Sequence, residues 1–346
     1  MTALGKIHKL GVMLPLPVLP TGSGAFDYRV PDGMDLEPGD FVTVPFGHRR
    51  AVGVVWGAAA GGVSDAKLKD IIERLDCPPL PEVSRRFVDW VARYTISPPG
   101  AVLKMVMSVP DALSPPKPVT AYALTPNPGD FKKTAARERV LAVLDGAPPL
   151  PATELARQAA TGPGVVAGLA KAGVLITVAL APNIAALGVE PDWEKPGPAL
   201  SVDQEQAAKI LEQATETSGF SVVLLDGVPG SGKTEVYFQA VAKALEHSRQ
   251  VLVLLPEIAL SAQWLARFKA RFGGDPVEWH SDLTPSVRRD TWRAISEGRA
   301  RVVVGARSAL FLPFPDLALI VADEEHDASF KQEDGVIYNA RDMAVV

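Results

Sequence analysis

Over the first hundred residues, apolar and polar positions alternate in short runs. Three of these runs, FDYRV, FVTVPFG and AVGVVWG, are typical of β-strands, and only three residues separate the last two. This spacing predicts a hairpin that belongs to a small barrel or an open sheet. The segment EVSRRFVDWVARYT follows, and its apolar residues fall at helical spacing: Val83, Phe87, Trp90, Val91 and Tyr94. We expect one face of this helix to cover the sheet.

Proline and glycine separate this region from a second, smaller one. Residues 111–135 contain DALSPPKP and TPNPGD and predict a linker. Residues 136–182 contain three short helical patterns, followed by an apolar extended pair. Three helices with a small β-wing are typical of a winged-helix module, and a generic helical spacer fits the pattern equally well. A second linker is predicted over residues 183–199.

From residue 200 onward, short and almost wholly apolar runs alternate with amphipathic helices. The runs are SVVLLDG, QVLVLLP, VEWHS, RVVVGA and LALIVADEE. Apolar strands separated by helices predict a parallel sheet that is covered on both faces. The sequence therefore predicts a multidomain α/β chain, with a β-rich domain over residues 1–110, a small helical region over residues 136–182 and a parallel-sheet α/β domain over residues 200–346.

The net charge does not decide which partners the chain binds. The chain has 35 Lys and Arg and 40 Asp and Glu, which gives a formal net charge of −5. The acidic excess belongs to residues 200–346, which carry −6, whereas residues 1–110 carry +1. Local basic patches can still bind phosphates, so the balance neither supports nor excludes a DNA partner.

The chain has one cysteine, Cys77, which excludes a disulfide framework or a cysteine-based metal site within these residues. We interpret it as a small buried apolar residue. No run approaches the ~20 apolar residues of a membrane span, and the first twenty residues lack a signal-peptide core. The expected location is the cytoplasm, with no membrane partner.

The most specific motif is GVPGSGKT, which fits G-x-x-x-x-G-K-[ST] and lies between a predicted strand and a predicted helix. Its glycines let successive N–H groups point at one anion, and the helix that follows adds the positive end of its dipole. Lys233 should reach the β- and γ-phosphates of ATP, and Thr234 should offer a hydroxyl to Mg²⁺. The predicted nucleotide-binding residues are Gly227, Gly230, Ser231, Gly232, Lys233 and Thr234.

The run LALIVADEEH places acidic residues directly after an apolar strand. Both carboxylates should emerge at the carboxyl edge of the sheet, where ligands bind in open α/β folds. We expect Asp323 to hold Mg²⁺ together with Thr234, and Glu324 to orient the attacking water. The predicted catalytic residues are thus Lys233, Asp323 and Glu324, while His326 either couples the nucleotide to a neighbouring site or caps a turn.

Two further loops follow apolar strands, at residues 255–263 and 304–314. In a translocating ATPase, such loops contact a nucleic-acid backbone without reading its sequence. An ordinary connection between a strand and a helix is the alternative.

The motifs GVPGSGKTEVY, LLPEIALSAQ, HSDLT, VVVGARSALFLPF, DEEHDASFKQEDG and YNARD occur in this order. Together they resemble the PriA family of superfamily 2 DNA helicases, which act in bacterial replication restart. The N-terminal FDYRVP, PGDFVTVPFG and GVVW segments are also similar to that family. The resemblance implies a domain that holds the 3′ end of a nascent strand, a winged helix on DNA, and a RecA-like core that moves 3′ to 5′ with ATP.

The resemblance also implies roles for particular residues. By motif match, the 3′-end pocket would involve Phe26, Asp27, Gly47 and Lys69, and Asp27 would face the terminal hydroxyl. Gln204 matches the residue that reads adenine in related helicases, with Gln206 as the alternative.

The segment that follows the DEEH motif matches the family's DNA-sensing loop, which is poor in aromatic residues in this chain. The DNA-binding residues implied there and in the GARS motif are Arg307, Phe330 and Lys331, and His326 would have the coupling role.

Family members continue beyond the ARD segment with a cysteine-rich zinc-binding region and a second ATPase lobe that carries an arginine finger. Neither is found in these residues, so zinc is expected only in the missing part. An arginine finger contributes about 10³–10⁵ in rate, so we expect slow hydrolysis and little unwinding.

The chain is thus expected to be the N-terminal portion of a replication-restart helicase that recognises stalled forks and initiates primosome assembly. ATP and Mg²⁺ are the expected cofactors. The expected partners are forked and single-stranded DNA, primosome proteins and single-stranded-DNA-binding protein, in the cytoplasm at the nucleoid. The alternative is a DNA-structure-binding module that does not hydrolyse ATP.

Overall fold

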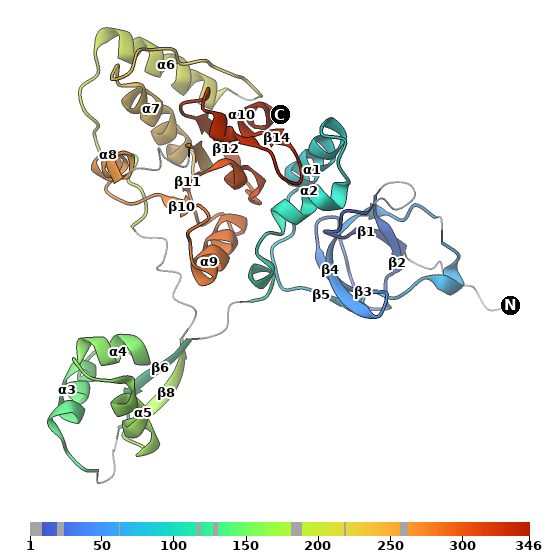
Figure 1. Cartoon of the computed structure of the whole chain (residues 1–346). Coiled ribbons are helices and arrows are strands. Elements are labelled where there is room, and N and C mark those ends of the chain that lie inside the picture. Colours follow the sequence, from blue (N-terminus) through green and yellow to red (C-terminus); the bar gives the residue numbers. More distant parts are fainter. Residues whose placement is uncertain are drawn as a thin grey trace. The chain divides into compact units, whose positions relative to one another are not determined.

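The computed structural model describes residues 9–18, 24–61, 63–115, 119–126, 131–180, 189–217, 219–256 and 262–346. The chain divides into two compact units, one formed by residues 1–115 together with 186–346 and the other by residues 116–185 (Figure 1). No helix among the described residues has the length and the apolar character needed to cross a membrane.

The N-terminal part of the larger unit is a five-stranded antiparallel sheet in the order β2-β1-β4-β3-β5. Its strands are β1 (Lys9–Met13), β2 (Phe26–Arg29), β3 (Phe41–Phe46), β4 (Arg49–Ala58) and β5 (Glu73–Arg74). The predicted hairpin is confirmed, because β3 pairs with β4 across a tight turn at Gly47 and His48. Gly47 has a φ of 61°, a conformation that glycine adopts at little cost.

The segment that leads into β5 closes this sheet into a small barrel. The N–H of Arg29 on β2 donates to Lys69 O at 2.9 Å, and the N–H of Ile71 donates to Arg29 O at 3.0 Å. The N–H of Ile72 then donates to Thr43 O on β3 at 2.8 Å. One extended segment therefore bridges β2 and β3, and of the two predicted alternatives the structure has the barrel.

Helix α1 (Glu82–Tyr94) forms as predicted, and α2 (Pro99–Val106) follows it. The predicted buried face is partly wrong, because Val83 and Tyr94 are exposed while Val88 and Ala92 are buried. Helix α1 packs against α2, and of the predicted face Val91 is buried while Phe87 and Trp90 are partly buried against the core.

The second part of the larger unit contains a parallel four-stranded sheet in the order β10-β11-β9-β12. Its strands are β9 (Gln250–Leu254), β10 (Val277–Trp279), β11 (Val302–Gly305) and β12 (Leu317–Ala322). Strand β9 is completely buried, whereas every residue of β12 is partly exposed. Among the described strands, β9 is the only partner of β12, so the other edge of β12 is open.

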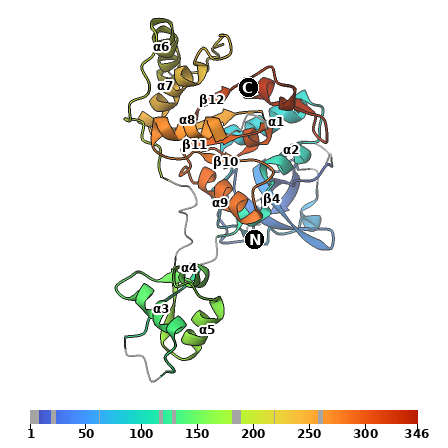
Figure 2. The same ribbon diagram turned by 60° about the vertical axis from the view of Figure 1, so that its left-hand side comes forward.

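Helices surround this sheet, and α6 runs beside α7 in both views of the ribbon (Figures 1 and 2). The helices are α6 (Val202–Glu216), α7 (Lys233–Glu246), α8 (Ala262–Phe272), α9 (Pro285–Ser296) and α10 (Ala340–Ala344). The short elements are η1 (Asp65–Lys67), η2 (Pro110–Leu113), η4 (Arg307–Phe311), η5 (Ala328–Phe330), β13 (Lys331–Gln332) and β14 (Tyr338–Asn339).

The strand predicted for SVVLLDG does not form, because residues 219–228 pair with no strand of the described chain. Phe220 and Leu224 in this segment are 72% and 78% exposed. A strand requires a neighbouring backbone as well as an apolar sequence, and here only the sequence condition is met.

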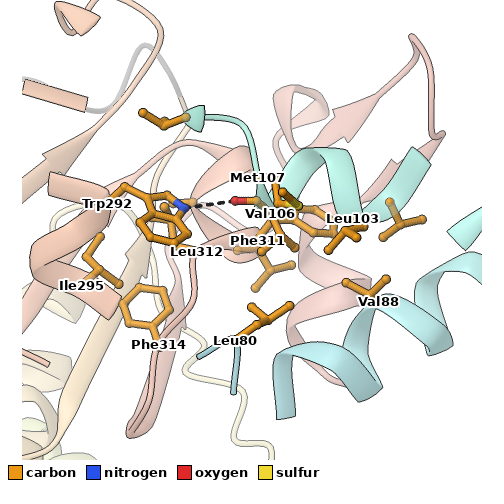
Figure 3. Close-up of a cluster of buried hydrophobic side chains, with 14 of the residues drawn as sticks. Leu80, Val88, Leu103, Val106, Met107, Trp292, Ile295, Phe311, Leu312 and Phe314 are labelled. Carbon is orange, nitrogen blue, oxygen red and sulfur yellow. Dashed lines mark hydrogen bonds between the residues drawn. The ribbon is translucent and has the colours of Figure 1, made fainter. Parts of the chain in front are cut away.

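One hydrophobic core joins the two parts of the larger unit (Figure 3). Val88, Leu103 and Val106 from the N-terminal helices pack with residues of the parallel sheet region, among them Trp292 and Phe311. The indole N–H of fully buried Trp292 donates to Val106 O at 3.0 Å. The predicted domain boundary at residue 110 therefore does not separate two hydrophobic cores.

The described second part of the predicted linker over residues 183–199 has no helix or strand, but it makes specific contacts. The N–H of Asp192 donates to Phe272 O at 2.8 Å, and the guanidinium of Arg271 donates to Lys195 O. This segment therefore packs against α8.

The smaller unit consists of three helices and a three-stranded sheet in the order β7-β6-β8. Its elements are β6 (Val119–Leu124), α3 (Ala135–Leu144), β7 (Leu150–Pro151), α4 (Ala152–Gln158), α5 (Pro163–Lys171) and β8 (Leu175–Leu180). The three predicted helices are confirmed. The partner of β8 is β6, which precedes the helices, so the linker predicted over residues 111–135 is wrong there.

The shared core predicts that Trp292→Ala destabilises the larger unit by about 3–5 kcal/mol, because it leaves a large cavity and removes a buried hydrogen bond. Chemical unfolding followed by circular dichroism measures this free energy. Phe220→Ala is the control, since Phe220 is 72% exposed and should change the free energy by less than about 0.5 kcal/mol. Equal effects of the two substitutions would contradict a core shared around Trp292.

Candidate functional site

The GVPGSGKT segment forms a curled loop that leads directly into α7, which begins at Lys233. Gly230 and Gly232 both have a φ of 81°, so the loop uses backbone conformations that other residues rarely adopt. The ammonium group of Lys233 folds back and donates to Gly227 O at 2.7 Å. The predicted nucleotide-binding residues of this motif thus lie together in one loop at the N-terminus of a helix.

Gln204 connects helix α6 to this loop. Its side-chain oxygen accepts from Ser201 N at 2.8 Å as part of a capping box, and its amide nitrogen donates to Ser231 O at 2.7 Å. A side chain at Gly232 would collide with this amide group. Both polar ends of Gln204 are therefore engaged, and its role in reading adenine remains a prediction. The alternative, Gln206, is exposed.

Asp323 lies directly after β12, and its N–H donates to Leu254 O at the end of β9 at 3.1 Å. One carboxylate oxygen accepts from the Tyr237 hydroxyl at 2.9 Å, and the other accepts from Glu324 N at 3.0 Å. Tyr237 lies on α7 one turn after Lys233, and its hydroxyl also contacts Thr234. The structure thus brings the predicted magnesium residues Thr234 and Asp323 to the same tyrosine.

The remaining residues of the DEEH motif make contacts of their own. Glu324 has a φ of 52°, which is unusual for a residue with a side chain. Glu325 forms an ion pair with Arg341 at 3.0 Å. His326 is exposed, and its Nε2 lies 3.8 Å from a carboxylate oxygen of Glu324. This contact places His326 beside Glu324. The predicted role of His326 in coupling the nucleotide to a neighbouring site remains a prediction.

Arg307 contacts the segment that carries Phe330 and Lys331, and the role of these three residues in DNA binding remains a prediction. The Arg307 guanidinium donates to Ser329 O at 2.8 Å and to Lys331 O at 3.1 Å. Phe330 is buried in the shared core, so its ring is not presented to a base in this structure. Of the loop predicted at residues 255–263, residues 257–261 lie outside the described residues.

Three of the four predicted 3′-end residues meet near the turn between β3 and β4. The Phe26 ring packs edge to face against Phe46 with centroids 5.4 Å apart, and the Lys69 ammonium donates to Gly47 O at 3.4 Å. The carboxylate of Asp27 instead accepts from the N–H groups of Ala60 and Gly61, both at 2.8 Å. A carboxylate held in this way still has lone pairs for a further donor.

The residues present suit a magnesium nucleotide. Mg²⁺ prefers oxygen ligands, and the Thr234 hydroxyl and Asp323 carboxylate both offer them beside Tyr237. Lys233 and the main-chain N–H groups at the start of α7 supply the positive environment that phosphates require.

Tyr237 was not found by sequence reasoning, although a signal was available. It lies four positions after Lys233 and three after Thr234, so on a helix it faces the same side as both. Burial raises the pKa of the Tyr237 hydroxyl far above its ordinary value, and the negative charge of Asp323 raises that pKa further. The hydroxyl therefore keeps its proton and acts as a hydrogen-bond donor.

Comparison with known proteins agrees with this arrangement. Residues 11–108 match the family model of the PriA 3′ DNA-binding domain, and residues 201–344 match that of the DEAD/DEAH box helicases. The larger unit therefore combines a DNA-binding domain with a helicase domain.

Two relatives that match nearly the whole chain identify its protein family. Replication restart protein PriA of Rickettsia felis is 34% identical over 323 residues, which are 92% of this chain and 38% of the relative. The Haemophilus influenzae protein of the same name is 34% identical over 353 residues, covering 99% of this chain and 47% of the relative. The chain belongs to the PriA family, and it spans less than half the length of these relatives.

The left-handed conformation of Glu324 predicts a specific pattern of stability. Because glycine tolerates this conformation, Glu324→Gly should be about 1 kcal/mol more stable than Glu324→Ala in chemical unfolding. Glu325 has no positive φ, so the same pair of substitutions there should have the opposite order. If Glu324→Ala were more stable than Glu324→Gly, as is expected for the pair at Glu325, the backbone at Glu324 would not be strained.

Proposed function

We propose that this chain is the nucleotide-binding and DNA-binding portion of an ATP-dependent DNA helicase of replication restart. The observation that carries this proposal is the hydrogen bond from Tyr237 to Asp323, which joins the helix of the phosphate loop to the acidic end of β12. The matching DNA-binding and helicase domains support the same function.

In this proposal, Lys233 and the N-terminus of α7 bind the phosphates, while Thr234 and Asp323 hold Mg²⁺. ATP supplies the free energy through cleavage of its terminal phosphate, and Glu324 orients the attacking water. Gln204 keeps α6 against the loop and is a candidate reader of the base.

The barrel would bind the 3′ end of a nascent strand at a fork through Phe26, Asp27, Gly47 and Lys69. The smaller unit would act as a winged helix on DNA, which its three helices and small sheet support. Motion from 3′ to 5′, recognition of stalled forks and primosome assembly with single-stranded-DNA-binding protein are part of the same proposal.

A second candidate is a DNA-structure-binding module that does not hydrolyse ATP. It is favoured by residues 219–228, which lie immediately before and within the phosphate loop but outside the sheet. Phosphate release by the wild-type chain, with and without forked DNA, separates the two candidates. Robust DNA-stimulated release would exclude the second.

We expect Lys233→Ala to weaken the binding of a fluorescent ATP analogue at least about tenfold, because a charged hydrogen bond to phosphate contributes about 1.5–3 kcal/mol. Fluorescence titration in the presence of Mg²⁺ measures this affinity. Lys209→Ala removes an exposed lysine on α6 and serves as the control. Equal affinity of both variants would exclude the phosphate-binding role of this loop.

For the barrel, we expect the wild-type chain to bind a fork that ends in a 3′-hydroxyl more tightly than one that ends in a 3′-phosphate. A hydroxyl can donate to the Asp27 carboxylate, whereas a phosphate is repelled by it. Asp27→Ala should remove this difference in a fluorescence anisotropy titration, whereas Asp32→Ala, at an exposed acidic position, should retain it. Equal binding of both forks by the wild type would count against the pocket.

A further inference from the structure

Three polar side chains from three different elements form a chain of hydrogen bonds inside the larger unit. The indole N–H of Trp264 on α8 donates to the Tyr237 hydroxyl of α7 at 2.6 Å. That hydroxyl lies 2.9 Å from a carboxylate oxygen of Asp323, directly after β12. Trp264 and Tyr237 are only 6% and 5% exposed, so water competes little for these contacts.

The chemistry of the donors fixes the direction of each bond. An indole N–H can only donate, so the Tyr237 oxygen accepts from Trp264. An ionised carboxylate can only accept, so the single phenolic hydrogen of Tyr237 goes to Asp323. Because this hydrogen is already used, the threonine hydroxyl is the donor in its contact with Tyr237. The oxygen lone pairs of Thr234 therefore remain available to a cation.

The contacts also determine the orientation of the Asp323 carboxylate. Tyr237 donates to one oxygen and Glu324 N donates to the other, so the plane of the group is held at both ends. A carboxylate offers about four lone-pair positions, so the two hydrogen bonds leave acceptor capacity for a metal. The Tyr237 hydroxyl thus contacts both Thr234 and Asp323.

We propose that Tyr237 is a positioning residue for the magnesium site, and that Trp264 directs its hydroxyl hydrogen toward Asp323. This inference rests on the proposed nucleotide function and adds to it a metal-orienting role for helices α7 and α8. Residues behind metal ligands commonly contribute about 10–100-fold to metal affinity by fixing the ligand orientation.

The test measures binding of fluorescent ADP to the chain with saturating Mg²⁺ and with a chelator. The ratio of the two affinities reports the contribution of the metal alone. We expect Tyr237→Phe to reduce this ratio by about tenfold or more, while affinity in the chelator stays unchanged. Trp264→Phe keeps an aromatic ring but loses the indole donor, so it should reduce the ratio by less.

Tyr338→Phe is the matched control. Tyr338 is 3% exposed, and its hydroxyl has no hydrogen-bond partner among the described residues. This variant loses the same atom from an equally buried tyrosine in the same unit, so its ratio should equal that of the wild type. Thermal unfolding of all variants shows whether each is folded.

The possible results separate the inference from the proposed function. If the wild type binds nucleotide with a clear magnesium contribution and Tyr237→Phe retains it, the positioning role is wrong. An equal loss of affinity with and without Mg²⁺ in folded Tyr237→Phe would also overturn it, since the role would then be general packing. If the wild type binds no nucleotide, the proposed function fails and this inference fails with it.

Discussion

The arrangement of the larger unit depends on the burial of strand β9. Its side chains alternate between two cores, as the geometry of a strand requires. Leu252 and Leu254 belong to the core that includes the N-terminal helices, whereas Val251 and Val253 pack with α7 and α8. Because β11 and β12 occupy its two edges, β9 fixes where the acidic end of β12 lies relative to the phosphate-loop helix.

The same two cores connect regions with different expected ligands. On one face, Val106 and Trp292 join the N-terminal helices to α9, and Phe330 lies in this core as well. On the other face, Tyr237 and Trp264 belong to the core between α7 and α8. A change in the packing of one face therefore acts on β9, which also supports the other face. In the proposed function, the DNA-binding and nucleotide-binding regions would therefore share β9 as a common packing element.

Features that depend on local sequence were predictable. The glycines and Lys233 of the phosphate loop, the hairpin around Gly47 and the apolar strand before Asp323 follow from neighbouring residues alone. Cys77 is likewise buried, and burial raises the pKa of its thiol to about 12.

Features that depend on distant partners were not predictable. Strand β6 lies in a segment whose composition indicates a linker, and its pairing with β8 is set by residues more than fifty positions away. The run before the phosphate loop has a strand-like sequence but no neighbouring strand. The Tyr237 contact required knowing where β12 ends relative to α7, which no single window of sequence contains.

The open edge of β12 has a consequence for how this molecule behaves in solution. Unpaired N–H and C=O groups along a strand form a template on which another chain can add by main-chain hydrogen bonding. Phe220 and Leu224 add exposed apolar surface to the same unit. A strand edge of this kind favours association with another polypeptide, and a strand that paired with β12 would satisfy these main-chain groups and cover the edge.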